Sequence, residues 1–419
     1  MGSACVTALA ESGFEVTGIG RLASAARGAD PRASWVFRDI PSVTPEEWQT
    51  LLAGVSVVVN AAGALQDGAR DDLEAIHVHT LSALTRAAAD LPLRIIQISA
   101  AGVSPTASTR FFRTKAEGDA ILAREGRDWV ILRPALVLAP EAYGGTALLR
   151  AAASLPGLLP EVLPEARIQT VHIGDLAAAV VAAAKGEVPH ATVADLCEAE
   201  SQNLPELSLA LRRWLGLPEP RFRPRLPRWL LQASSRIADA LGHLGWRSPL
   251  RSTALRALAD GITGDPATWT NAGGAPCRPL SATLASMPAT RADRLAARAF
   301  LALPLAIATL AVFWMLSGLV TLAAPQAADH VLTSRGMSEP LAQTLVRGGA
   351  LADILLGLMI LWRPGARLAA LGMAGLSATY LALSLFTAPD LWADPLGPML
   401  KVLPGLVLAL WVWLFLEDR

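Results

Sequence analysis

The apolar positions of the chain form long uninterrupted stretches only in its last third. No residue from Ala299 to Ala328 is charged, and the stretch from Leu368 to Pro389 is also uncharged. A helix needs about 20 mostly apolar residues to cross the roughly 30 Å hydrocarbon layer of a bilayer. Buried helices of a soluble protein are the alternative, but several such segments so close together disfavour it. The pattern therefore predicts an all-α bundle of four transmembrane helices, at about residues 299–323, 341–362, 368–387 and 396–416.

Charged residues around these predicted spans are distributed unequally. Arginines precede the first span and lie between the second and the third, whereas the loop after the third span carries only acids: Arg291, Arg294, Arg298, Arg363 and Arg367 against Asp390 and Asp394. Basic loops stay in the cytoplasm. We therefore expect the preceding two thirds of the chain and the C-terminus to be cytoplasmic.

One ionisable residue, Asp353, falls in the middle of the second predicted span. A charge at that depth is costly, so such a residue is a functional candidate by default. The equal alternative is a carboxyl group that pairs with polar neighbours inside the bundle. Lys401, on the fourth predicted span, is a candidate partner.

Before residue 205 the pattern is different, because short β-branched runs alternate with segments rich in Ala and Leu. The runs at 55–59, 94–98 and 129–132 are typical of strands buried on both faces, and 14–19 and 34–37 also indicate strands. This alternation predicts a Rossmann-type α/β fold, a doubly wound parallel sheet. We expect three parts: a nucleotide-binding domain over residues 1–205, a basic connector over 206–290 and the membrane domain over 291–419.

The beginning of the predicted sheet is incomplete. Such a fold opens with a strand and a glycine loop, whose backbone N–H groups hold a pyrophosphate at a helix N-terminus. This chain begins in the helix itself, with Gly2 where the last glycine of the loop would be. We therefore expect a misplaced start codon, with the central first strand encoded upstream; an in-frame stop directly before Met1 would refute this.

Two residues indicate which dinucleotide such a domain would bind. The residue that reads the ribose lies about 20 positions after the glycine loop, and an acid there favours NAD. This chain has Arg21, which suits the 2′-phosphate of NADP, so NADP is favoured slightly over NAD. Asp39 would lie near the adenine. The alternative for Arg21 is a solvated surface arginine.

Several motifs recur together along the first half of the chain: Asn60-Ala61-Ala62-Gly63, Ser99, Lys115, Arg133-Pro134 and the segment 171–175, Val-His-Ile-Gly-Asp. With these motifs, residues 1–210 resemble the extended or atypical short-chain dehydrogenase/reductase family, close to its NmrA-like members and to the accessory Rossmann subunit of respiratory complex I. The resemblance implies that the Asn60–Gly63 turn and Lys115 hold the nicotinamide ribose. It also implies that Ser99 polarises the substrate and that Arg133-Pro134 lies at the cofactor.

The chain departs from this family at its proton donor. The family uses Tyr-x-x-x-Lys, in which the phenol exchanges a proton with the substrate oxygen. Here Phe111 precedes Lys115 at that spacing, and His77 stands where many members have a catalytic Asn. Tyr143 is a conceivable substitute, because it follows the sixth strand in a glycine-rich loop. We expect cofactor binding to survive better than catalysis.

The membrane third has a resemblance of its own. Residues 313–318, Phe-Trp-Met-Leu-Ser-Gly, and 352–357, Ala-Asp-Ile-Leu-Leu-Gly, resemble the DoxX-like family of small four-span proteins. The fusion of these two domains is a bacterial arrangement, which implies the inner membrane.

The connector is strongly basic, with ten arginines against Glu219 and Asp239 between residues 212 and 256. From Pro227 onward, Leu230, Ile237, Leu241 and Leu244 fall on one helical face. A helix resting on anionic lipid head groups is the preferred interpretation. A solvated basic face of a substrate lobe is compatible with it, whereas nucleic-acid binding is disfavoured, since the net charge of the chain is zero.

Other chemistry finds no support in the sequence. The three cysteines are far apart and fit a reducing compartment, and the six histidines do not cluster as metal ligands would. We therefore expect no metal. Three hypotheses remain: a membrane-anchored NAD(P)-dependent oxidoreductase or epimerase-like enzyme with a small, lipid-soluble substrate; a catalytically weak NAD(P)H sensor or assembly protein of a membrane complex; and an appendage to a functional membrane bundle.

Overall fold

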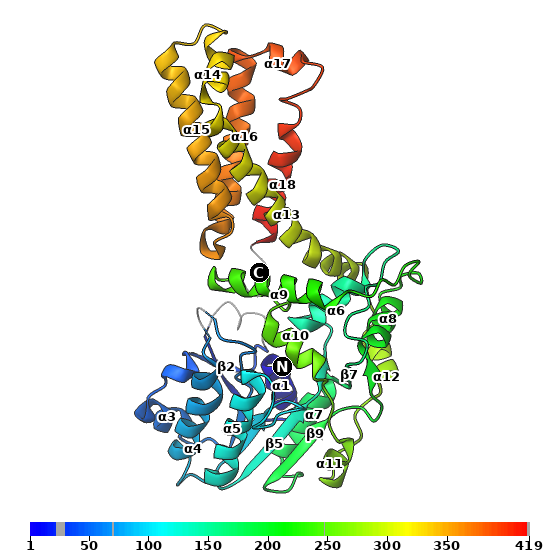
Figure 1. The fold of residues 1–419 in the computed structure, drawn as a ribbon. Helices are drawn as coiled ribbons and strands as arrows, with labels where there is room; N and C mark the ends of the chain where they lie inside the picture. Colours follow the sequence, from blue (N-terminus) through cyan, green and yellow to red (C-terminus); the bar gives the residue numbers. More distant parts are fainter. Residues whose placement is uncertain (22–29, 69–70, 247, 417–419) are drawn as a thin grey trace. The chain divides into compact units, whose positions relative to one another are not determined.

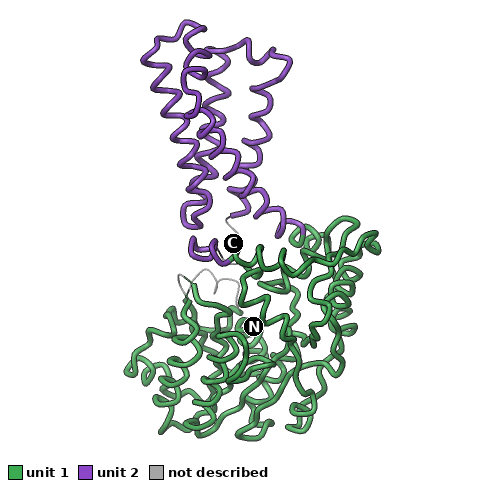
Figure 2. Tube along the Cα trace, viewed as in Figure 1, with its two compact units in different colours: residues 1–238, 248–297 green, residues 239–247, 298–419 purple. Residues whose placement is uncertain are grey.

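The computed structural model describes residues 1–21, 30–68, 71–246 and 248–416. The chain separates into two compact units, which Figure 2 shows in different colours. Unit 1 comprises residues 1–238 and 248–297, and unit 2 comprises residues 239–247 and 298–419. Most of the segment expected as a connector thus belongs to unit 1, and residues 239–247 belong to unit 2.

Unit 1 contains the predicted parallel sheet. Its four central strands are parallel and follow the order β3-β4-β5-β9. Helices lie on both faces (Figure 1), which confirms the doubly wound fold. One core cluster lies under α1 and α7, and a second lies under α3 and α4. These elements are β3 (Val57–Asn60), β4 (Arg94–Ile98), β5 (Trp129–Pro134), β9 (Thr192–Leu196), α1 (Gly2–Glu11), α3 (Pro45–Leu52), α4 (Thr80–Ala87), α5 (Arg110–Glu125) and α7 (Ile173–Ala184).

The sheet is divided between β3 and the first strands of the chain. β1 (Thr17–Gly20) pairs in parallel with β2 (Ser34–Phe37), and within the described residues neither β1 nor β3 has a strand on its other edge. Both cores nevertheless extend past the division. Ile19 of β1 and Val58 of β3 pack on one cluster, and Val16 and Val57 pack on the other.

The remainder of unit 1 forms a further apolar cluster beside the sheet, built from α6, α8 and their neighbours. Local sequence signals start two of the helices. Thr44 and Asn203 each form a capping box, with Glu47 and Glu206 respectively. The remaining elements are η1 (Ile40–Ser42), η2 (Ala75–His79), β6 (Leu136–Leu138), α6 (Gly145–Ala153), β7 (Arg167–Ile168), β8 (Thr170–His172), β10 (Gln202–Asn203), α8 (Leu204–Trp214), α10 (Ser252–Ala259), α11 (Pro266–Asn271) and α12 (Leu280–Ser286).

Unit 2 is helical. Among the described residues, three helices are long and apolar enough to cross a membrane: α13 (Arg291–Ala323), α15 (Glu339–Met359) and α16 (Arg363–Thr387). They correspond to the first three predicted spans. The fourth expected span, 396–416, is shorter in the structure, because α18 (Val402–Phe415) has only 14 residues. Gly397 has a φ of 59°, and Pro398 lacks an N–H group, so the helix begins later than expected. Between these helices lie α14 (Pro325–Thr333) and α17 (Asp390–Ala393).

Glycines bring two of the long helices close together. A Cβ added at Gly318 of α13 would lie 2.4 Å from the Ala350 carbonyl oxygen of α15. Small residues at such contacts are typical of helix packing in membranes. The close approach places the Ser317 hydroxyl 2.9 Å from Oδ2 of Asp353, and the Tyr380 hydroxyl lies 3.4 Å from Oδ1. Asp353 therefore has polar neighbours inside the bundle, whereas Lys401 is exposed.

Candidate functional site

The turn after β3 is built by Asn60, which is buried. Its Oδ1 accepts a hydrogen bond from the Ala62 N–H at 3.1 Å, and its Nδ2 donates to Oε1 of Gln97 on β4 at 2.8 Å. A Cβ added at Gly63 would lie 3.6 Å from Nε2 of His77 and 3.7 Å from Nζ of Lys115. The backbone of the turn therefore lies next to both of these side chains.

The first residues of α1 lie beside the same turn. A Cβ added at Gly2 would lie 3.7 Å from the Cβ of Ala61. The first N–H groups of a helix have no partner within the helix and bind anions well. The structure thus brings the predicted residues Gly2, Asn60, Ala61, Ala62 and Gly63 together at the carboxyl end of β3.

Helix α5 places three side chains in one row, because Phe111, Lys115 and Asp119 follow each other at intervals of four residues. The Lys115 side chain is buried, and its ammonium group donates a 3.1 Å hydrogen bond to the Ile98 carbonyl oxygen. Burial lowers the pKa of Lys115 to about 8, although the nearby Asp119 carboxylate acts in the opposite direction. The Phe111 ring centroid lies 5.9 Å from the Lys115 nitrogen.

Asp119 is the centre of a buried polar cluster. Its Oδ2 accepts hydrogen bonds from the Ser99 hydroxyl at 2.8 Å and from Nη2 of Arg133 at 3.1 Å. Burial raises the pKa of Asp119, and its hydrogen bonds and neighbouring cations oppose this shift. Ser99 and Arg133 are therefore engaged with a protein carboxylate. The Pro134 carbonyl oxygen accepts a separate backbone hydrogen bond from the Ala101 N–H at 2.9 Å.

His77 lies in the π-helical turn η2, a form of helix that often occurs at functional sites. Its Nε2 accepts a hydrogen bond from the Ala64 N–H at 3.3 Å, which assigns the ring proton to Nδ1. Nδ1 lies 2.9 Å from the Thr114 hydroxyl, and that hydroxyl donates to the Phe111 carbonyl oxygen at 3.2 Å. Burial, together with the positive charge of Lys115, lowers the pKa of His77 to about 3. The imidazole is therefore neutral, and both of its nitrogens are occupied.

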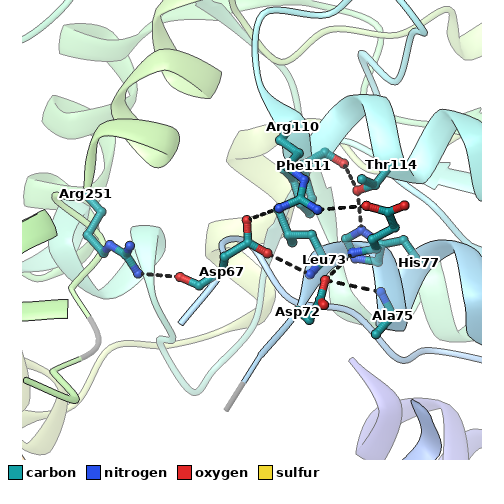
Figure 3. A network of polar contacts seen from close by, with 10 residues as sticks. Asp67, Asp72, Leu73, Ala75, His77, Arg110, Phe111, Thr114 and Arg251 are labelled. Carbon is teal, nitrogen blue, oxygen red and sulfur yellow. Dashed lines mark hydrogen bonds and ion pairs between the residues drawn. The ribbon is translucent and has the colours of Figure 1, made fainter. Parts of the chain in front are cut away.

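Ion pairs connect the loop before η2 to the first turn of α5 (Figure 3). Arg110 donates to Asp67 at 2.7 Å and to Glu74 at 2.9 Å. Asp67 also accepts from the Leu73 N–H at 2.9 Å, and its carbonyl oxygen accepts from Arg251 at 2.9 Å. These contacts hold the loop beside Phe111 and His77, whose rings meet edge to face at 5.7 Å.

A separate hollow of ≈ 370 Å³ opens at the ends of β1 and β2, and its lining consists of Arg21, Phe37, Arg38 and Asp39. Nε of Arg21 lies 3.9 Å from Oδ1 of Asp39, so the structure brings these two predicted residues together. Phe37 is 40% exposed and offers a flat apolar surface. Phe37 and Arg38 were not predicted, although they directly precede Asp39 in the sequence.

The site residues that the sequence did not predict are the hydrogen-bond partners of those that it did predict. Asp119, Thr114 and Gln97 carry the hydrogen bonds of Ser99, His77 and Asn60. The spacing of four residues between Lys115 and Asp119 was the one available signal.

Tyr143 is 80% exposed, and no described hydrogen bond joins it to Lys115 or His77. Over the described ranges, no three His, Cys, Asp or Glu side chains gather as metal ligands would.

Comparisons with known proteins agree with this description. Residues 1–187 match the NAD(P)H-binding family model, and residues 311–410 match the DoxX-like family. No curated protein matches the chain.

Solved structures share the fold of the first part. The Bordetella bronchiseptica enzyme WbmH in complex with NAD⁺ is 21% identical with a TM-score of 0.51, and the match covers 69% of this chain and 93% of that one. The structure of gox2253 is 18% identical with a TM-score of 0.53, covering 71% and 96%. The Bordetella bronchiseptica enzyme WbmG in complex with NAD and UDP is 15% identical with a TM-score of 0.50, covering 68% and 89%.

Proposed function

We propose that this chain, which joins an NAD(P)H-binding domain to a DoxX-like domain, is a membrane-anchored dinucleotide-binding protein of low catalytic power. It would sense NAD(P)H or help to assemble a membrane complex. The observation that carries this proposal is Phe111, which occupies the position of the proton donor beside Lys115. A phenyl ring has no proton to exchange, so the site keeps its cofactor contacts and lacks its acid.

The residues around the β3 turn fit a nicotinamide dinucleotide. The start of α1 and the close approach at Gly2 suit the pyrophosphate, since unpaired N–H groups favour phosphate oxygens. The Asn60–Gly63 turn and the Lys115 ammonium group suit the nicotinamide ribose. When bound, the dinucleotide supplies hydride chemistry, and the protein supplies binding and orientation.

The hollow at β1 and β2 supports NADP over NAD. Arg21 and Arg38 both line it, and guanidinium groups match the geometry of a phosphate. Phe37, next to them, offers a surface on which an adenine ring can stack. Arg21 pairs with Asp71 at 2.9 Å and lies beside Asp39, which limits the positive charge there, so the expected preference for NADPH over NADH is modest.

The other polar groups of the site support binding rather than turnover. The Ser99 hydroxyl is held by Asp119, so it does not point its proton at a substrate oxygen. His77 is neutral, and backbone and Thr114 occupy its nitrogens. Asp119, one turn beyond Lys115 on α5, is held by Ser99 and Arg133 and does not take the place of the missing phenol.

A second candidate function is an NAD(P)-dependent oxidoreductase. The retained Lys115 favours it, because that side chain stays buried beside the Gly63 turn and burial lowers its pKa to about 8. Such an enzyme would act on a substrate that accepts a hydride without a proton from the protein. A small, lipid-soluble acceptor delivered from the bilayer would suit a domain anchored in a membrane.

The proposed location is the inner membrane of a bacterium, with unit 1 and the C-terminus in the cytoplasm. Three long apolar helices and the arginines that flank them support it. The C-terminal residues 417–419 lie outside the described residues. A fluorescent-protein fusion at the C-terminus tests the orientation, because it should fluoresce only in the cytoplasm.

The test of the function is a turnover assay on the full chain in lipid nanodiscs. NADPH is supplied together with carbonyl and quinone acceptors, and its absorbance is followed while a parallel sample measures binding. We expect saturable binding with NADPH oxidation no faster than in empty nanodiscs. Sustained oxidation that Lys115→Met abolishes and Lys185→Met spares would instead establish the oxidoreductase; Lys185 is exposed and far along the chain from the site.

A further inference from the structure

Helix α9 (Arg228–His243) presents three different sides. Leu231, Ser235 and Ala238 are buried at 9%, 6% and 5% exposure. Successive residues of a helix are rotated by about 100°, so these three positions form one continuous side. This is the buried side of residues 228–238, the part of the helix that belongs to unit 1.

The opposite side of α9 is apolar and exposed. Trp229 is 68% exposed, Ile237 is 63% exposed and Leu230 is 40% exposed. Ala233 lies between Trp229 and Ile237 in the same row and is also exposed. Apolar area left in water forgoes the stabilisation that burial gives. The amphipathic face predicted from the sequence is thus not the face that the fold buries.

A basic row runs alongside this apolar row. Arg228, Gln232 and Arg236 are exposed and lie one position before Trp229, Ala233 and Ile237. The segment just before the helix adds further exposed residues of both kinds: Arg221, Phe222, Arg223 and Arg225. Cationic and aromatic groups side by side on one helix are typical of a helix that lies in the interface of a bilayer.

We infer that the exposed side of α9 docks on the anionic head-group layer of the membrane in which the chain is anchored. Trp229, Ala233 and Ile237 enter the boundary of the acyl chains, and Arg228 and Arg236 contact lipid phosphates. This inference rests on the membrane location proposed above. Charge favours lipid over a second copy of the chain, because two copies of this basic face would repel each other.

The covalent connection strengthens the case for lipid. The apolar helix α13 begins at Arg291, within the same chain, so a bilayer that holds α13 is always available to α9 at high effective concentration. Each arginine near an anionic surface adds to the attraction, and burial of the apolar row adds to it further. Weak individual contacts therefore suffice for stable docking once the chain is anchored.

The experiment places an environment-sensitive fluorophore on α9 in the full chain. Cys277→Ser removes the half-buried thiol, Cys5 and Cys197 are buried, and Ile237→Cys provides the labelling site. Lys185→Cys, at an exposed position outside α9, is the matched control. The labelled proteins are reconstituted in vesicles of phosphatidylglycerol and phosphatidylcholine that contain a lipid-borne quencher.

We expect severalfold stronger quenching at position 237 than at position 185, and weaker quenching when phosphatidylcholine alone is used. Equal quenching at the two positions would overturn the inference. If quenching at position 237 instead becomes weaker as the protein-to-lipid ratio rises, a second copy of the chain covers this side of α9, and the inference is overturned. Extraction of the same vesicles at alkaline pH tests the anchoring separately. If the chain resists extraction but the fluorophore at position 237 is not quenched, the docking of α9 is refuted and the membrane location is not.

Discussion

The Ser99 hydroxyl donates a 2.8 Å hydrogen bond to Oδ2 of Asp119, and the two side chains are only 4% and 3% exposed. The same oxygen accepts from Arg133, whereas Oδ1 of Asp119 is buried without a described partner. A serine that polarises a substrate must direct its hydroxyl at that substrate. In this chain the hydroxyl instead donates its hydrogen bond to a buried carboxyl group of the protein.

The first prediction concerns this pair. Asp119→Ala leaves Arg133 and Ser99 without their partner, and breaking a buried ion pair costs about 3 kcal/mol of unfolding free energy. Ser99→Ala removes one neutral donor and costs about 1 kcal/mol. Thermal unfolding of the two variants checks the order. If Ser99→Ala leaves stability intact but weakens NADPH binding severely, Ser99 faces the ligand and our description of its role is wrong.

Phe111→Tyr tests whether the site is an enzyme that lacks a single hydroxyl. The ring is half-buried, and its centroid lies 5.9 Å from the Lys115 nitrogen. We predict unchanged NADPH affinity and no gain in NADPH oxidation, because Ser99 remains held by Asp119. The measurement is turnover with carbonyl acceptors at saturating NADPH. A gain of about a hundredfold or more, the size of effect that a positioned acid supplies, would favour the oxidoreductase.

The affinity for NADPH should depend on pH through Lys115. The folded-state pKa of this lysine is about 8, so its ammonium form predominates below that pH and its neutral form above it. We predict that NADPH binding weakens severalfold between about pH 7 and pH 9, since a neutral amine attracts the anionic dinucleotide less. Lys115→Arg keeps its charge throughout this range and should give a flat profile. A wild-type profile that is equally flat would contradict the role of Lys115.

His77 should make the stability of unit 1 depend on pH. Its pKa is about 3 when folded and 6.5 ordinarily, so between these values the unfolded chain binds a proton that the folded chain does not. Stability is therefore fully present above pH 6.5 and falls as the pH is lowered, by at most about 1.4 kcal/mol per pH unit. Unfolding temperatures across this range check the slope. His77→Gln should reduce it, whereas His79→Gln, at an exposed position in the same turn, should not.

Glycine 118 should be indispensable to the packing of α5. A Cβ added there would lie 2.2 Å from the His77 carbonyl oxygen, a distance that real atoms do not tolerate. We predict that Gly118→Ala lowers the unfolding free energy by about 2 kcal/mol and weakens NADPH binding through displacement of η2. Gly145→Ala is the control, since a Cβ at Gly145 meets nothing within 4 Å. Equal stability of the two variants would show that α5 and η2 shift apart easily.

The fold could be predicted because its signals are local. Three β-branched runs became β3, β4 and β5, and long uncharged stretches became α13 and α16. The length of α18 was predicted wrongly. The span was placed from the hydropathy of residues 396–416, and hydropathy carries no information on how Gly397 and Pro398 delay the start of a helix. Proline and glycine act on the backbone, whatever the hydropathy of their neighbours.

The candidate site could be predicted only in part. Motif spacing located Asn60 and Lys115, but the bonds that orient them join residues 37 and 17 positions apart. The bond between Ser99 and Asp119 likewise depends on how α5 packs against β4 and β5. Such contacts follow from tertiary packing, and no period along the chain encodes them. The row of Phe111, Lys115 and Asp119 is the exception, because helix geometry alone places them together.

The most direct test of the central claim is an equilibrium titration of the full chain with NADPH, in lipid nanodiscs, followed by nicotinamide fluorescence. Wild type, Lys115→Met and Lys185→Met are titrated side by side. The account predicts saturable binding by wild type and Lys185→Met, and at least about tenfold weaker binding by Lys115→Met, which corresponds to a loss of about 1.4 kcal/mol. Absence of saturable binding by the wild-type chain, or equal binding by all three proteins, would contradict it.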